Sequence, residues 1–229
     1  MRKCNAIMGD MIETIIHKSD RMRLGIMGGT FDPIHYGHLL AAEEARVAIS
    51  LDRVIFVPSG SPPHKKYPGM ASAEDRYGMT LLATNGNPSF DVTRLETDRK
   101  GSSYTVETLQ RMKELYPGAD LYMITGEDAA LDLPLWRDPY KIVSLAKIVA
   151  VSRPGGYHDK IGELPDEIRE SVLVLRTALL DISATDIRER LASGRSANYL
   201  LPDAVLAYIK KRGLYVKARN TGQRYKNNE

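Results

Sequence analysis

Short apolar segments alternate with longer amphipathic ones along most of this 229-residue chain. The apolar segments have the length and composition of buried strands, and the stretches between them have the spacing of helices. Strands are expected at residues 23–27, 53–57, 90–92, 120–125, 147–151 and 171–175. Helices are expected at 39–50, 72–84 and 105–115, in a short stretch before 147, and from about 184 and 203. This alternation predicts an α/β fold: a parallel sheet with right-handed crossovers, helices on both faces and a helical C-terminal segment.

The chain is long enough for one domain with a complete core, and its composition is that of a globular protein, 43% hydrophobic and 27% charged. We expect a single domain over residues 23–216. Residues 1–22 read as an extension without assigned function. The basic tail at 217–229 lacks apolar periodicity, which predicts disorder there.

The net charge of +3 is concentrated at the two ends. The tail holds four basic residues and one acidic residue, and the first 22 residues hold four basic and three acidic, so the body is close to neutral. This distribution argues against a nucleic-acid partner, which needs a basic patch on the fold. One cysteine, Cys4, excludes an internal disulfide. Neither a membrane span nor a signal peptide is visible. We expect a cytoplasmic protein without a membrane partner; its oligomeric state is not deducible.

Residues 28–38 read GGTFDPIHYGH and lie between the first predicted strand and an alanine-rich helix. A glycine turn at such a junction exposes backbone N–H groups, and the helix dipole favours negative charge there. His35 and His38 fall on one side of the first helical turn. The glycines fit neither the dinucleotide fingerprint nor a Walker sequence. The stretch indicates phosphate chemistry, against the alternative of two surface histidines. A zinc site is not expected, because no Cys or acidic pair completes it.

A second phosphate site is predicted at residues 182–188, which read ISATDIR. Ser183 and Asp186 have the spacing of a capping box, so a helix is expected to begin there, and its N-terminus can hold a phosphate. Arg188, one turn further along, can chelate a phosphate through its planar fork. The alternative is an ordinary capped helix with a solvated arginine.

These segments resemble the motifs of the HxGH nucleotidyltransferases, most closely the bacterial-type nicotinate-nucleotide adenylyltransferases. The resemblance covers roughly residues 23–215 and includes three further motifs: PPHK at 62–65, SYTVETL at 103–109 and the glycine-acidic segment 126–128. It implies a Rossmann-like nucleotidyltransferase of NAD biosynthesis that joins ATP and nicotinate mononucleotide to give nicotinate adenine dinucleotide and pyrophosphate.

The resemblance also implies roles for particular residues. Those expected at ATP are Gly28, Gly29, Thr30, Phe31, His38, Gly126, Asp128, Ser183, Thr185 and Arg188. Those expected at the mononucleotide are Lys65, Tyr104, Thr105, Trp136 and Arg137. Thr105 would receive the nicotinate carboxylate at a helix N-terminus, and Trp136 would stack on the pyridine ring. Arg137 stands where some relatives have an aromatic residue. Four of these residues also have an ordinary alternative: Thr105 and Asp128 as helix caps, Trp136 in the core and Lys65 in a solvated turn.

The implied reaction needs little covalent chemistry from the protein. A phosphate oxygen of the mononucleotide attacks the α-phosphorus of ATP, so catalysis reduces to alignment and stabilisation of charge. His35, His38, Lys65 and Arg188 are expected to carry it. Mg²⁺ would arrive with ATP, without a dedicated set of protein ligands. Two alternatives stay open: a sibling enzyme that prefers nicotinamide mononucleotide or another phosphate acceptor, and a nucleotide-binding sensor without turnover.

Overall fold

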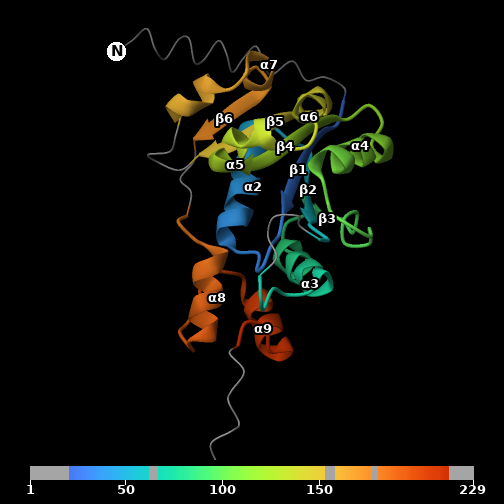
Figure 1. Ribbon diagram of the computed structural model, residues 1–229. Coiled ribbons are helices and arrows are strands. Elements are labelled where there is room, and N and C mark those ends of the chain that lie inside the picture. The colour runs from blue at the N-terminus through green and yellow to red at the C-terminus, as the bar shows by residue number, and fades with distance from the viewer. Residues whose placement is uncertain (1–20, 62–66, 153–157, 177–179, 217–229) are drawn as a thin grey trace, which may run out of the picture.

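Six parallel strands form one sheet in the computed structural model, which describes residues 21–61, 67–152, 158–176 and 180–216 (Figure 1). The strands are β1 (Arg23–Gly29), β2 (Arg53–Pro58), β3 (Phe90–Val92), β4 (Asp120–Gly126), β5 (Ala146–Ser152) and β6 (Val172–Arg176). Their spatial order is β3-β2-β1-β4-β5-β6. The order reverses between β1 and β4, and in such sheets ligands bind beyond the carboxyl ends of the strands at this point. The predicted Rossmann-like fold is confirmed.

One face of the sheet is covered by α2 (Tyr36–Ala48), α3 (Ala73–Thr84), α8 (Ala184–Ala192) and α9 (Asp203–Arg212). The buried residues of α2 are three alanines, whose small side chains let the helix approach the strands closely: Ala41, Ala42 and Ala45. The two C-terminal helices continue this layer, with α9 beside α3 (Figure 1). This face therefore brings the first predicted phosphate motif and the second into one layer.

The other face is covered by α4 (Thr105–Leu115), α5 (Glu127–Leu131), η1 (Leu133–Leu135), α6 (Pro139–Leu145), η2 (His158–Glu163) and α7 (Asp166–Arg169). Val106, Leu109 and Met112 of α4 recur every three residues and are buried against the strands, so the helix presents one apolar stripe to the sheet. Helices thus lie on both faces, as predicted.

Most predicted element boundaries agree with the structure within two residues, and two regions differ. Helix α2 begins at Tyr36 rather than residue 39, because His35 has extended backbone and is the N-cap, which places His38 in the first turn. The connection after β5, where the sequence predicts no helix, contains η2 and α7. Both segments are short and Pro165 lies between them as the N-cap of α7, so neither is long enough to show a helical period in the sequence.

Residues 1–20 and 217–229 lie outside the described residues, so the expectations for the extension and the tail stay predictions. Within the described ranges, no helix is long and apolar enough to cross a membrane.

Candidate active site

The glycine turn predicted to bind phosphate follows β1 directly, at the carboxyl edge of the sheet. Glycine at position 29 makes room for the Phe31 ring, because a Cβ atom there would lie 2.7 Å from the ring and the ring would have to shift. Phe31 has φ of 50°, which is uncommon for a residue with a side chain. Its buried ring packs against Phe56 and meets the His38 ring edge-on at 5.1 Å. The turn is thus fixed by the ring that it folds over.

The two histidines of the signature lie together at the start of α2, with ring centroids 3.8 Å apart. His35 is buried, and its backbone N–H donates to Nδ1 of His38 at 3.3 Å. A ring nitrogen that accepts a hydrogen bond carries no proton, so the neutral His38 ring has its proton on Nε2. His38 is half-exposed. The arrangement fixes the His38 tautomer that can donate a hydrogen bond to a phosphate oxygen.

Sequence reasoning missed Asp32, whose carboxylate joins the signature to two other segments, residues 67–71 and Tyr215 after α9. Its buried carboxylate accepts hydrogen bonds from the Ala71 backbone N–H at 3.2 Å and from the hydroxyls of Tyr67 and Tyr215. Burial raises the pKa of both tyrosines, and the adjoining Asp32 carboxylate raises each further, so both hydroxyls donate at neutral pH. No local pattern marks Asp32, because its partners lie 35 or more positions away in the sequence.

Arg188 of the second motif reaches the signature loop. One guanidinium nitrogen donates to the backbone oxygen of Asp32 at 2.7 Å, and the other donates to the Thr185 hydroxyl at 3.1 Å. The guanidinium also lies over the Tyr67 ring, 4.5 Å from its centroid. The two predicted phosphate motifs, 156 positions apart at this contact, are therefore side by side.

The start of α8 differs in detail from the predicted capping box. Ser183 is the N-cap, as expected, and its hydroxyl accepts from the Thr185 backbone N–H at 3.2 Å. Asp186 does not return to the N-cap; its carboxylate pairs with Arg190 at 2.7 Å. The ion pair with Arg190, one helical turn further along, takes the place of a hydrogen bond from the Asp186 carboxylate to the N-cap.

Four of the five residues predicted to contact the mononucleotide are described, and they gather beside the start of α4. Tyr104 is the N-cap and Thr105 the first helical residue, so the N-cap alternative for Thr105 is wrong. The Arg137 guanidinium lies 4.6 Å from the Tyr104 ring centroid. Trp136 is half-buried, and it packs with Tyr104 against the same buried cluster. Four predicted residues from two distant segments are thus neighbours on this face.

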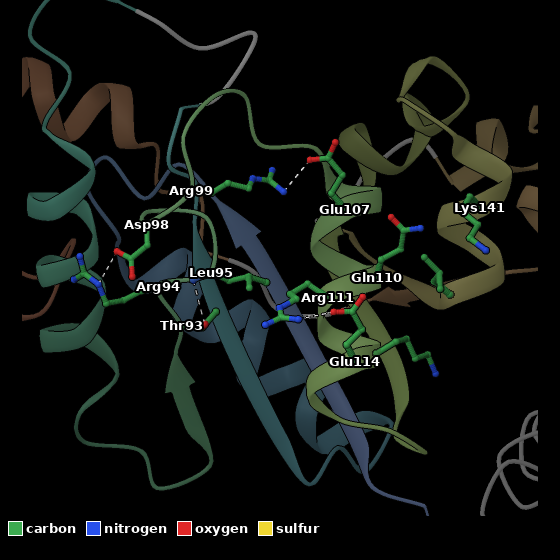
Figure 2. A pocket seen from close by; sticks show the side chains of 12 residues that line it. Thr93, Arg94, Leu95, Asp98, Arg99, Glu107, Gln110, Arg111, Glu114 and Lys141 are labelled. Carbon is green, nitrogen blue, oxygen red and sulfur yellow. Dashed lines mark hydrogen bonds and ion pairs between the residues drawn. The ribbon is translucent and has the colours of Figure 1, made fainter.

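Charged side chains surround the first turn of α4. Glu107 forms ion pairs with Arg99 at 2.8 Å and with Arg137 at 3.3 Å. Figure 2 shows the first of these at the rim of a hollow of about 870 Å³. The lining of the hollow is mostly charged: Arg94, Asp98, Arg99, Glu107, Arg111, Lys113, Glu114 and Lys141 belong to it, with none of the signature residues. Its arginines form ion pairs with neighbouring carboxylates.

The glycine-acidic segment lies at the end of β4, where Gly126 is the N-cap of α5. Asp128 is exposed and lines a second hollow, of about 550 Å³. Its neighbour Glu127 is buried and accepts a hydrogen bond from the Ser152 hydroxyl at 2.7 Å, which ties the ends of β4 and β5 together. The buried Glu127, which the sequence analysis did not single out, therefore holds the neighbouring Asp128 at the carboxyl edge of the sheet.

Lys65 lies outside the described residues, as does the rest of the PPHK segment. The residues on either side of this segment are described and both contact other motifs: Ser61 accepts from the Ser103 backbone N–H at 3.3 Å, and Tyr67 bonds to Asp32. In the described part of the chain, no group of three or more His, Cys, Asp or Glu side chains is placed to hold a metal ion.

Comparisons with known proteins agree with this geometry. The Cytidylyltransferase-like family model matches residues 26–190, so the chain belongs to that family and is a nucleotidyltransferase. A probable nicotinate-nucleotide adenylyltransferase from Moorella thermoacetica is 50% identical over 198 residues, 84% of this chain and 91% of the relative. Another, from Corynebacterium kroppenstedtii, is 49% identical over 202 residues, 87% and 94% of the two chains.

A solved structure shares the fold. The nicotinic acid mononucleotide adenylyltransferase of Plasmodium falciparum, in its complex with NaAD, superposes with a TM-score of 0.69 at 20% identity, over 85% of this chain and 98% of that one. Within the cytidylyltransferase-like enzymes, the chain belongs to the nicotinate-nucleotide adenylyltransferases.

Proposed function

We propose that this chain transfers the adenylyl group of ATP to nicotinate mononucleotide, with release of pyrophosphate. The observation that carries the proposal is the contact between Arg188 and Asp32, which unites two phosphate motifs at the switch point of the sheet. A phosphate oxygen of the mononucleotide forms a bond to the α-phosphorus of ATP. The bond between that phosphorus and the bridging oxygen breaks, and pyrophosphate leaves with the electron pair.

His38 and Arg188 are proposed to stabilise the charge that develops on the phosphates. Nε2 of His38 would donate its proton to a phosphate oxygen, and His35 holds the ring in that tautomer through its backbone N–H. A guanidinium has five N–H donors, so Arg188 can keep its contacts to Asp32 and Thr185 and still bind a phosphate. Lys65 would add a further cation, and Mg²⁺ enters as part of the ATP substrate.

The remaining ATP contacts are proposed along the carboxyl edge of the sheet. The backbone of Gly28–Phe31 would hold phosphates at the N-terminal end of α2. The backbone of Gly126 and the carboxylate of Asp128 would bind the adenosine ribose. Ser183 and Thr185 would face the phosphates from the first turn of α8.

The acid form of the mononucleotide fits the start of α4. A carboxylate accepts charge-assisted hydrogen bonds, and here the N-terminal end of a helix, the Thr105 hydroxyl and the nearby Arg137 guanidinium offer them. The indole of Trp136 would cover the pyridine face. An amide offers no negative charge to these donors, so we expect the acid to be preferred.

Pyrophosphate release, followed with ATP and each of several acceptors, tests the proposal. We expect turnover with nicotinate mononucleotide, a slower rate with nicotinamide mononucleotide and none without an acceptor. A higher kcat/KM for the amide would assign the chain to the sibling activity. No pyrophosphate with any acceptor, alongside measurable ATP binding, would identify a sensor instead.

A further inference from the structure

Resting on the proposed function, we propose that Arg76 is a positioning residue that fixes the distance between the ATP half and the mononucleotide half of the site. It acts through Gly60 and Glu96, so that a continuous series of contacts runs from the signature loop to the start of α4. Arg76 lies on α3, and its side chain is only 1% exposed. It therefore acts on the site through its neighbours and not by touching a substrate.

The Arg76 guanidinium joins three loops through their backbone oxygens. It donates to Thr30 of the signature at 2.8 Å, to Gly60 after β2 at 2.9 Å and to Ala71 before α3 at 3.3 Å. Only a planar fork with several fixed donors can reach oxygens in different directions at once. The signature turn and the end of β2 are therefore held at one separation by a single side chain.

Gly60, which accepts a hydrogen bond from Arg76, also contacts the segment that precedes α4. A Cβ atom on Gly60 would lie 2.1 Å from the backbone oxygen of Glu96, so the two backbones are in direct contact. This close approach requires glycine. The neighbouring Ser61 strengthens the contact by accepting the Ser103 backbone N–H at 3.3 Å.

Glu96 completes the series at the first turns of α4. Its buried carboxylate accepts the Thr108 hydroxyl at 2.5 Å, and Thr108 is the second threonine of the SYTVETL motif. Burial raises the pKa of Glu96, while the hydrogen bond from Thr108 and the charges of Arg99 and Arg76 oppose that rise. The helix that carries Thr105 is thus anchored to the same framework as the signature turn.

A buried arginine that bonds only to neutral oxygens needs a reason, since an uncompensated charge is costly to bury. Asp32 and Glu96, both buried, lie close enough to Arg76 to oppose the lowering of its pKa by burial. The cation thus sits between the two acids that anchor the two half-sites. Its removal would release both sides together.

This arrangement matters because direct transfer depends on alignment. A displacement of about 1 Å in a reacting group can cost about 100-fold in rate even when each substrate still binds. A positioning role for Arg76 therefore predicts a loss of kcat with little change in the affinity for either substrate alone.

Arg76→Lys separates geometry from charge, because it keeps the cation and loses the fork. We expect kcat with ATP and nicotinate mononucleotide to fall by about 100-fold, with KM for each substrate within about threefold of the wild type. Met79→Ala is the control: it removes a buried side chain from the same helix, so it destabilises the fold without touching the series. We expect its kcat, measured well below its denaturation midpoint, to match the wild type.

The opposite end of the series offers a second, milder test. Thr108→Val keeps the shape and removes the hydroxyl that bonds to Glu96, and Thr108→Ser keeps the hydroxyl. We expect Thr108→Val to lower kcat by about tenfold with unchanged KM values, and Thr108→Ser to restore most of the loss.

Calorimetric titration with the dinucleotide gives a readout that does not need turnover. Nicotinate adenine dinucleotide spans both half-sites, so its affinity depends on their separation. In Arg76→Lys we expect its Kd to rise about tenfold or more, while the Kd values of ATP and of the mononucleotide stay within about threefold. Equal losses for all three ligands, or kcat within twofold of the wild type, would overturn the proposal. A wild type that binds the dinucleotide but releases no pyrophosphate would refute only the proposed function.

Discussion

At the residue scale, the site depends on side chains whose orientation is set by a second contact. His38 is held by the backbone of His35 and by the edge-on Phe31 ring, and Arg188 is held by Asp32 and Thr185. Such groups are already oriented before a phosphate binds, so they lose little conformational freedom on binding. Their hydrogen bonds can therefore stabilise the charge that develops in the transition state. We therefore expect the proposed donors, His38 and Arg188, to act on kcat more than on binding.

Replacing His38 by alanine tests this directly. We expect kcat to fall by about 10²–10³-fold, the scale for one preorganised donor, with the far-ultraviolet circular dichroism spectrum unchanged. Val47→Ala is the control, because Val47 is 62% exposed at the other end of the same helix. A kcat within fivefold of the wild type in His38→Ala would remove His38 from the mechanism.

At the element scale, helix α8 reaches the signature loop through the guanidinium group of Arg188. Arg188 spans from α8 to the signature, whereas Arg190 pairs with Asp186 on the surface of the helix. The two arginines are two positions apart and point to different surroundings. Their comparison separates a role in phosphate binding from a role in helix stability.

We expect Arg188→Lys to lower kcat/KM for ATP by about 10- to 100-fold, because a point charge cannot hold Asp32 and a phosphate together. Arg190→Lys, with a surface pair worth about 0–1 kcal/mol at most, should change it by less than twofold. Steady-state kinetics over a range of ATP concentrations measure both. Similar losses in the two variants would contradict a specific role for Arg188.

At the scale of the whole molecule, the C-terminal helix α9 closes the layer that carries the two predicted phosphate motifs. The carboxylate of Asp75 on α3 accepts hydrogen bonds from Tyr208 and Arg212 of α9, both at 3.0 Å. Burial alone would raise the pKa of Asp75, but the hydrogen bonds from Ser72, Tyr208 and Arg212 outweigh it and lower the pKa. The charged form is thus the one that docks α9.

This lowered pKa makes the docking of α9 sensitive to acid. An acid with a lowered pKa in the folded state stabilises the fold above its unfolded-state pKa, about 3.9, and the stabilisation is lost as pH falls through the folded-state value. We expect Asp75→Asn to reduce the free energy of unfolding at pH 7 by about 1–3 kcal/mol, with the difference shrinking below about pH 4. Urea denaturation of both proteins from pH 7 to pH 3 measures it.

Asp91→Asn is the matched control, because Asp91 pairs with Arg53 on the surface. Its free energy of unfolding should differ from that of the wild type by less than about 1 kcal/mol. A difference between the wild type and Asp75→Asn that stays constant down to pH 3 would contradict the role given to the charged form.

The sequence by itself determined the local features of this protein. The periods of strands and helices, like the capping residue Ser183, depend on residues that lie close together in the chain. The α/β class, the six strands and the motifs that resemble the adenylyltransferases could therefore be predicted. Only the tertiary structure decided which motifs touch. Asp32 meets Tyr215 across 183 positions, and Arg76 joins loops that no local pattern connects. Burial and hydrogen bonding of a charged side chain depend on the partners that the fold supplies, and those partners are not encoded beside it.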